Sequence, residues 1–275
     1  MPYRFASYYV IVCIAVILAG FWQSYFSVWG EVPWQFHAHG VAASVWVLMV
    51  LAQSWTPHHG QLAIHRVVGK SSLLLFPFLI GGLFGIIDLT AKGFVSGDGL
   101  SRVMFGGQFL IGLALAVAGY VTLYYRALKH RRKVWVHSGY MLATPLILLE
   151  SPLSRVFTTW VPGLTIQGPQ DFGRLMPVIV LAMAVELVVI VAIWFAYRDK
   201  ARPFLVAGVF IVAQMLTMGL LSDNALLEGL LLLIAPVPSA IVVLSGMAVG
   251  AATSWAGWQA GKRSVVPPVG AAQPA

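Results

Sequence analysis

Histidine side chains near the ends of apolar segments are the residues of this chain best suited to chemistry. The chain has seven histidines, and several fall close to the ends of segments long enough to cross a membrane. His65 and His137 both open segments that run from the cytoplasmic face outward, so their imidazoles should lie at a similar depth. Because a polar ring beside hydrocarbon is costly without a partner, this inner pair predicts a shared site.

A haem held between two helices would need two imidazoles at one depth, small residues near the macrocycle and a cation for its propionates. The sequence offers these groups as His65, His137, Gly69, Gly139 and Arg66, with Lys70 as a second cation. We therefore predict haem b or a divalent transition metal at His65 and His137, with Arg66 and Gly69 beside it. The simpler alternative is that both histidines hydrogen-bond lipid headgroups or cap a neighbouring helix.

A second group of ionisable residues falls near the predicted outer face. It comprises His37, His39, Asp88, Glu150 and Arg155. Imidazole and carboxylate together can hold zinc, iron or manganese, so the two histidines and two acids are a candidate metal site. The same groups could form a proton-linked polar gate. The structural alternative is an ion pair of Arg155 with Glu150 or Asp88, with the histidines merely hydrated.

Glu186 falls near the middle of a predicted span and is the most costly acid in the chain. An acid at this depth must be protonated, paired or beside water. We predict a proton or ion relay that includes Glu186 and Arg155, with Gln214 on the next span as a candidate partner of the acid. The common alternative is a hydrogen bond between helices.

Membrane-spanning helices must position these residues. The chain is 59% hydrophobic and 9% charged, and its mean hydropathy is +0.85. Apolar stretches of roughly 18 or more residues predict transmembrane helices, and they fall at Tyr8–Trp29, Phe36–Trp55, Ser71–Thr90, Val103–Tyr125, Val134–Leu153, Leu175–Tyr197, Pro203–Leu221 and Leu226–Ala251. The last contains Pro236 and Pro238, so we expect it to be kinked or broken there.

The predicted fold class is all-α: an integral membrane helix bundle of about eight transmembrane helices with both termini cytoplasmic. Residues 1–262 would form one transmembrane domain, followed by a disordered tail at 263–275. The longest outer connection would be Ser154–Arg174. The single cysteine, Cys13, leaves no intrachain disulfide and no cysteine metal cage.

Basic residues set the predicted orientation, because cytoplasmic loops carry an excess of lysine and arginine. With the amino terminus inside, only Lys92, Arg102, Arg155 and Arg174 of the 17 basic residues fall outside. This distribution indicates a multi-pass protein of a bacterial inner (cell) membrane. It also explains the net charge of +8 without nucleic acid, so the expected partners are the lipid bilayer and a membrane redox protein.

The first half of the chain carries a motif that reads HxHG, then W, then Q, then HRxxG. It is made by His37-Ala38-His39-Gly40, Trp46, Gln53 and His65-Arg66-x-x-Gly69, and is followed by His137, Met141-Leu142-Ala143-Thr144, Pro152 and Arg155. This pattern resembles a family of uncharacterised bacterial polytopic membrane proteins over about Phe36–Phe157. The resemblance singles out His39, His65, His137 and Arg155 and implies no particular activity.

A fainter likeness is to cytochrome b561-type proteins and to membrane proteins that assist terminal-oxidase assembly. The likeness implies histidines at matching depths on neighbouring helices. His65 and His137 fit that scheme at the inner side. At the outer side, Met104 and Gln108 stand where a second haem would need histidine.

From these residues we expect a membrane haem- or metal-binding redox protein, or an assembly factor for one. Two alternatives stay open. One is a proton-coupled transporter that uses Glu186, Asp88 and the outer histidines. The other is a membrane metal-dependent enzyme with an outward-facing site of histidine, aspartate and glutamate. The chain has no Walker loop, GxSxG elbow or HExxH motif, which argues against membrane metalloproteases.

Overall fold

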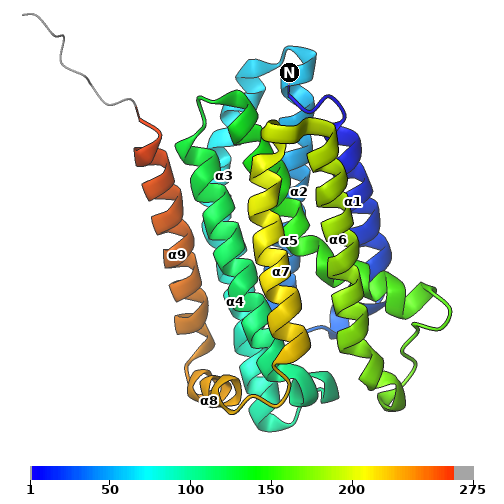
Figure 1. The fold of residues 1–275 in the computed structure, drawn as a ribbon. Coiled ribbons are helices and arrows are strands. Elements are labelled where there is room, and N and C mark those ends of the chain that lie inside the picture. Colours follow the sequence, from blue (N-terminus) through cyan, green and yellow to red (C-terminus); the bar gives the residue numbers. More distant parts are fainter. Residues whose placement is uncertain (1, 263–275) are drawn as a thin grey trace, which may run out of the picture.

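The chain folds into a bundle of helices in a computed structural model that describes residues 2–262 (Figure 1). Its α-helices are α1 (Ala6–Phe21), α2 (Trp34–Trp55), α3 (Leu62–Ser96), α4 (Leu100–Lys129), α5 (Val134–Trp160), α6 (Leu175–Tyr197), α7 (Arg202–Leu220), α8 (Ala225–Ile234) and α9 (Ser239–Ala260). No strand occurs within these residues, so the predicted all-α class is confirmed. The predicted tail at 263–275 lies outside the described residues.

Six segments of the described chain are long and apolar enough to cross a membrane. One of them, Pro169–Leu220, contains both α6 and α7. Large apolar side chains such as Leu74, Val188 and Val209 are exposed on the outside of the bundle, as expected where lipid rather than water is the solvent. These features indicate a multi-pass membrane protein.

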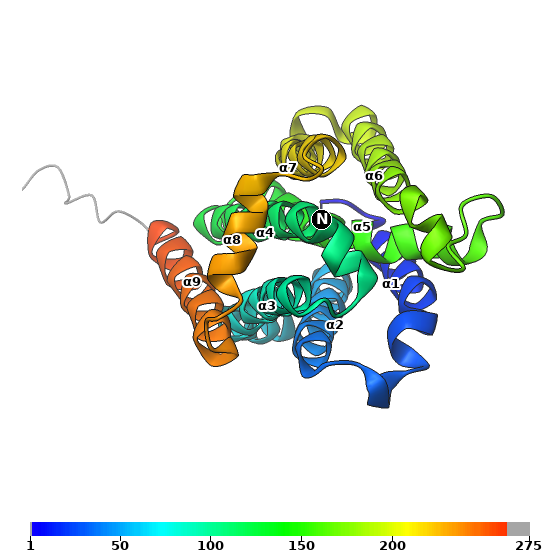
Figure 2. The ribbon, with the colours of Figure 1, turned by 90° about the horizontal axis from the view of Figure 1, so that it is seen from below.

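Four helices, α2 to α5, surround one interior (Figure 2). In this arrangement α3 packs against α2 and α4, and α5 packs against the same two helices, so α3 and α5 occupy opposite corners. The remaining long helices cover the outside: α1 packs on α2 and α5, α6 and α7 pack on α5, and α9 packs on α3 and α4. Residues that open α3 and α5 can therefore face each other across the interior.

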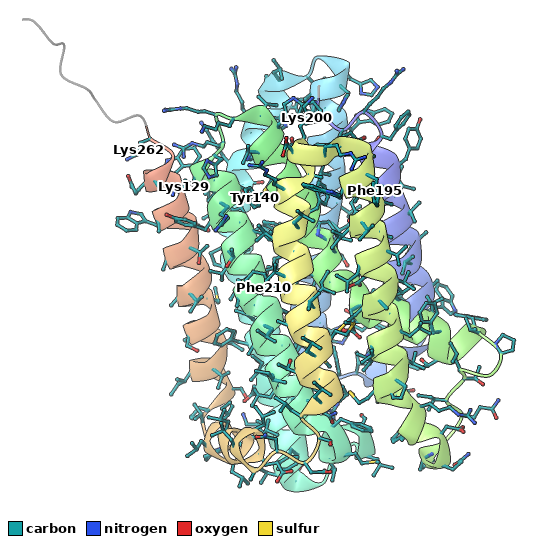
Figure 3. The ribbon with its side chains drawn as sticks, in the orientation of Figure 1. Lys129, Tyr140, Phe195, Lys200, Phe210 and Lys262 are labelled. Atoms are coloured by element: carbon teal, nitrogen blue, oxygen red, sulfur yellow. The ribbon has the colours of Figure 1, made fainter. Side chains whose placement is uncertain are left out.

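The two described ends of the chain lie at the same end of the bundle (Figure 1). Lys129, Lys200 and Lys262 also lie there, and we call it the basic end (Figure 3). The amino-terminal segment is held there by Tyr3, whose hydroxyl donates to the backbone carbonyl of Lys200 at 2.6 Å. Burial of this hydroxyl raises the pKa of Tyr3. The ammonium group of Lys200 in turn lies 4.3 Å from the centre of the Trp135 ring.

The last predicted span is two helices rather than one. Residues 235–238 separate α8 from α9, and α8 lies across the end of the bundle opposite the basic end (Figures 1 and 2). Proline at 236 and 238 denies the helix two backbone donors, which explains the break. The side chain of Asn224 accepts from the amides of Leu226 and Leu227 and so begins α8. The prediction of a break was right, and the boundaries Leu226–Ala251 were wrong.

The predicted outer connection also begins later than expected. We predicted that it starts at Ser154, but α5 continues to Trp160 and a 3-10 turn at Pro169–Arg174 leads into α6. Pro152 lies inside α5, where it is buried. The backbone carbonyl of Pro152 sits directly against Gly20 of α1, so close helix packing tolerates the proline there.

The contact between α3 and α9 depends on glycines of α9. A Cβ atom at Gly250 would lie 2.6 Å from Cα of Pro77 and 3.1 Å from the carbonyl oxygen of Phe76. Both neighbours are backbone atoms, so neither can rotate away. We expect Gly250→Ala to lower the free energy of unfolding by about 1–3 kcal/mol, measured as thermal unfolding in detergent. Gly229→Ala, where a Cβ meets nothing within 4 Å, is the control. Equal unfolding temperatures for the two variants would contradict this account.

Candidate functional site

The structure brings the predicted inner pair together at the basic end. His65 lies in the first turn of α3 and His137 in the first turn of α5. These helices run in the same direction at opposite corners around one interior, and the two histidines lie close enough for their charges to interact. The predicted equal depth therefore corresponds to proximity in space.

Hydrogen bonding leaves ring nitrogens of both histidines open. Nδ1 of His137 donates to the backbone carbonyl of Ala127 on α4 at 2.9 Å. A proton on Nδ1 leaves the lone pair of Nε2 available to a ligand. Nδ1 of His65 is buried and has no hydrogen-bond partner among residues 2–262. A buried nitrogen without a partner is costly, so it marks a place where a ligand would be stabilising.

Of the residues predicted beside the inner pair, some border it and one faces away from it. Arg66 is exposed, and its charge acts on His65. A Cβ at Gly69 would lie 3.3 Å from Oε1 of Gln53, whose Nε2 is buried without a partner in the described chain. Gly139 faces away from the pair, since a Cβ there would lie 2.8 Å from the Tyr3 hydroxyl. Gly69 and Gln53 therefore border the site, and Gly139 serves helix packing.

An aromatic cluster fills the bundle interior deeper than the inner pair. It consists of Trp46, Phe76, Tyr120 and Tyr124, each fully buried. The rings of Phe76 and Tyr124 stack with centroids 4.1 Å apart, and Nε1 of Trp46 donates to Oγ1 of Thr144 at 2.9 Å. Phe76 and Thr144 follow the inner histidines by about three and two helical turns. The cluster therefore lies between the inner pair and the outer residues.

The outer residues do not form the metal site predicted from sequence. Nδ1 of His37 lies 3.2 Å from the Tyr25 hydroxyl, and its ring packs beside Trp29. His39 is placed where α2 touches α3, with its Cα against Gly82, and its buried Nδ1 has no partner among the described residues. Across residues 2–262 no group of three or more His, Cys, Asp or Glu side chains is placed to hold a metal ion.

Asp88 has a partner that the sequence analysis missed. Its carboxylate is fully buried and accepts from Lys92 at 2.6 Å, and Lys92 also donates to Oγ of Ser239 at 2.6 Å. Nε2 of Gln35 lies 3.5 Å from the other carboxylate oxygen. The spacing of four residues between Asp88 and Lys92 was the signal that could have identified this pair. The structural alternative in which Arg155 pairs with Asp88 is therefore not realised.

Glu150 and Arg155 lie near each other but make their closest contacts elsewhere. Oγ of Ser154 donates to Glu150 at 3.2 Å. The guanidinium of Arg155 donates to the backbone carbonyl of Ser151 at 2.9 Å and lies 5.0 Å from the centre of the Phe21 ring. The charge of Arg155 still acts on Glu150. Their charges therefore interact, but within the described residues the two side chains do not form the ion pair of the structural alternative.

Glu186 has no partner where one was expected. Nε2 of Gln214 donates to the backbone carbonyl of Gly112 at 2.9 Å, so the predicted contact between Gln214 and the acid is wrong. Glu186 is 1% exposed, and neither carboxyl oxygen has a hydrogen-bond partner in the described part of the chain. Its surroundings include Tyr9 and Cys13, which sequence reasoning did not connect with it.

The inner pair is the arrangement best suited to binding a group that the chain itself does not supply. It offers two neighbouring imidazoles, one with its tautomer set by a backbone carbonyl and the other with a buried Nδ1 that has no hydrogen-bond partner among residues 2–262. An exposed cation, Arg66, and the amide of Gln53 border it. In comparisons with known proteins, no family model, no curated protein and no solved structure matches this chain.

Proposed function

We propose that the chain is a membrane redox protein, or an assembly factor for one, that binds haem or a transition metal through His65 and His137. The observation that supports this proposal is the buried Nδ1 of His65, which has no hydrogen-bond partner in the described chain and lies at the same end of the bundle as His137. Two protein nitrogens suffice for a haem, because the porphyrin supplies the other iron ligands. His65 and His137 are therefore the residues that would hold the group.

The chain's own residues would hold and tune such a centre. Ala127 fixes the orientation of the His137 ring through its carbonyl, and such a hydrogen bond also raises the basicity of the ligand. The aromatic cluster deeper in the interior excludes water from that side. Arg66 is placed to attract an anionic substituent at the basic end. When bound, a haem iron would supply one-electron transfer.

The two histidines suit a haem as ligands. The glycines near them are less well placed to accommodate a macrocycle. The unused Nδ1 of His65 is the buried polar atom that a bound group would satisfy. Gly139 is turned toward Tyr3, so it offers no flat face to a macrocycle. Gly69 borders the pair, but the Gln53 side chain covers it, so neither glycine presents an open face.

The direct test is an absorption spectrum with metal analysis of protein purified in mild detergent. A Soret band with an α band on reduction, at about one haem per chain, is the result that the proposal predicts. A stoichiometric metal without a Soret band would assign a non-haem centre to the same pair. Failure to retain either group, even after incubation of the purified protein with haemin and with transition-metal salts, would overturn the proposal.

Proton-coupled transport is a second candidate function, and the buried carboxyl of Glu186 favours it. An acid at this depth is rare in membrane helices unless it faces protein or serves a function. Asp88 gives the transport proposal less support, since it is held by Lys92. The spectrum separates the two candidates, because a transporter of this kind has no need of a chromophore.

We further propose that the chain crosses a bacterial inner membrane eight times, through α1 to α7 and α9, with the basic end in the cytoplasm. The predicted excess of basic residues at one face supports this orientation, and Lys129, Lys200 and Lys262 lie together at that end (Figure 3). The helix α8 would then lie at the outer surface, where its exposed leucines, such as Leu226 and Leu233, meet lipid.

Topology reporters test this arrangement. A reporter fused after Lys262, or inserted between Lys129 and Lys133, should report the cytoplasm. One inserted at Gly163, in the connection between α5 and α6, should report the outside. The excess of basic residues at one face sets this orientation, so the signals should be opposite. A cytoplasmic signal at Gly163 would contradict the count of eight.

A further inference from the structure

A group of polar side chains that includes Glu186 lies apart from the inner histidines. Glu186 lies on α6, Tyr9 and Cys13 lie one helical turn apart on α1, and Tyr120 lies on α4. The hydroxyls of Tyr9 and Tyr120 and both oxygens of Glu186 are buried without a partner among residues 2–262. Burying several neighbouring polar groups without hydrogen bonds costs free energy. Such a group therefore indicates a functional role.

These side chains come from three helices, and Tyr9 and Cys13 of α1 lie between the other two. The charge of Glu186 acts on both Tyr9 and Cys13, and Tyr120 interacts with Cys13. The Tyr9 hydroxyl and the Cys13 thiol are neighbours on one face of α1, because they are four residues apart. None of them can carry a positive charge, so no counter-ion for Glu186 is present within the group.

A carboxylate in this place would be an unpaired charge in an apolar interior. Such a charge is far more costly than the neutral acid, which has a proton to donate to a nearby oxygen or sulfur. A hydroxyl can both accept and donate a proton, so the Tyr9 hydroxyl near the acid has the chemistry to take part in proton exchange with it. The group is therefore suited to holding a proton inside the bundle.

A second acid links the group to the end of the bundle opposite the basic end. Glu150 on α5 lies near enough to Glu186 for their charges to oppose each other. Glu150 is only partly buried, accepts from Ser154, and is in the field of Arg155. Repulsion between the two acids means that a negative charge is better placed on Glu150, near Arg155, than on Glu186.

We propose that Glu186 is a proton-binding site in the bundle interior that exchanges its proton with the outer end of the bundle through Glu150. In the transfer, a proton leaves the Glu186 carboxyl as Glu150 takes one up, and the negative charge moves by the same step. This site is independent of His65 and His137. It would couple proton uptake to whatever the protein does in the membrane.

Infrared spectroscopy of the purified protein in lipid nanodiscs tests the proposal. At neutral pH the wild type should show the C=O stretch of a protonated carboxyl, shifted in D2O. Glu186→Gln should remove this band, and Glu31→Gln, at an exposed position, should leave it unchanged. Glu186→Met removes the same unpartnered acid and replaces Glu186→Gln if that variant does not fold. Absence of the band from the wild type would overturn the proton site. Persistence of the band in Glu186→Gln and in Glu186→Met would overturn it as well.

The route is tested by the rate at which the Glu186 band shifts after transfer to D2O. Groups that relay protons speed transfer by roughly 10²–10⁴-fold, so Glu150→Gln should slow this exchange at least about tenfold. Asp98→Asn, a change in an exposed acid at the same end, should leave the exchange rate unchanged. An unchanged exchange rate in Glu150→Gln would overturn the route through Glu150. The presence of the Glu186 band in the wild type tests the proton site separately.

Discussion

His65→Ala and His137→Ala are each expected to abolish cofactor retention, and the double variant is expected to be no worse than either single one. The reason is that one ligand cannot hold a centre built on two, so the second substitution has nothing left to remove. Such non-additivity distinguishes a shared site from two independent ones. The measurement is the amount of bound haem or metal per chain after purification, with thermal unfolding to show that each variant is folded.

Matched controls make this expectation specific to the inner pair. His58→Ala changes an exposed histidine whose Nδ1 contacts the backbone of Ser54, and should retain the full content. Arg66→Ala removes an exposed charge and should weaken retention by no more than about 1 kcal/mol, or roughly fivefold. Loss of the cofactor in His39→Ala but not in His65→Ala would move the site to the outer side. If His39→Ala, His65→Ala and His137→Ala all keep the full amount of cofactor, the inner pair has an interfacial role instead.

Added imidazole gives a further readout. His137→Gly leaves a space in which free imidazole could replace the lost ring, since Ala127 still offers its carbonyl as an acceptor. Recovery of the spectrum on adding imidazole would show that the ring acts as a ligand. A histidine needed only for folding would not be replaced in this way.

The equal depth of His65 and His137 could be predicted because it follows from helix direction. Each span reverses the chain, so two odd-numbered spans begin at the same face, and residues in their first turns share a depth. Hydropathy identifies this alternation without knowledge of packing. It does not say which helices are neighbours, and this is why Gln214 was paired with Glu186 although it bonds to Gly112.

The group around Glu186 was missed for a related reason. Tyrosine and a lone cysteine are common in membrane helices, and nothing in the spacing of Tyr9 and Tyr120 sets them apart from interfacial residues. Only the packing of α1, α4 and α6 around α5 brings them near the acid. The break before α9 could be predicted from its prolines, whereas the direction of α8 across the end of the bundle depends on where α7 ends and α9 begins.

Replacing Lys92 and replacing Asp88 should lower the stability of the protein by different amounts. Asp88 is 0% exposed, whereas the Lys92 side chain is 37% exposed. Lys92→Met would leave the buried carboxylate with only the amide of Gln35, 3.5 Å away. Asp88→Asn would leave an ammonium group that can reach water and can still donate to Ser239. Removing the lysine should therefore be much more costly than neutralising the acid.

We expect Lys92→Met to lower the free energy of unfolding by about 3–5 kcal/mol, the usual cost of leaving one buried charge unpaired. Asp88→Asn should cost roughly 1 kcal/mol, as for an exposed pair. The double variant Asp88→Asn/Lys92→Met contains neither charge, so no buried charge is left unpaired. It should therefore recover most of the stability lost in Lys92→Met. Thermal unfolding in detergent measures all three, with Asp98→Asn, in the exposed pair with Arg102, as the control. Equal losses for the two single variants would show that burial of the carboxylate does not set the energy of this pair.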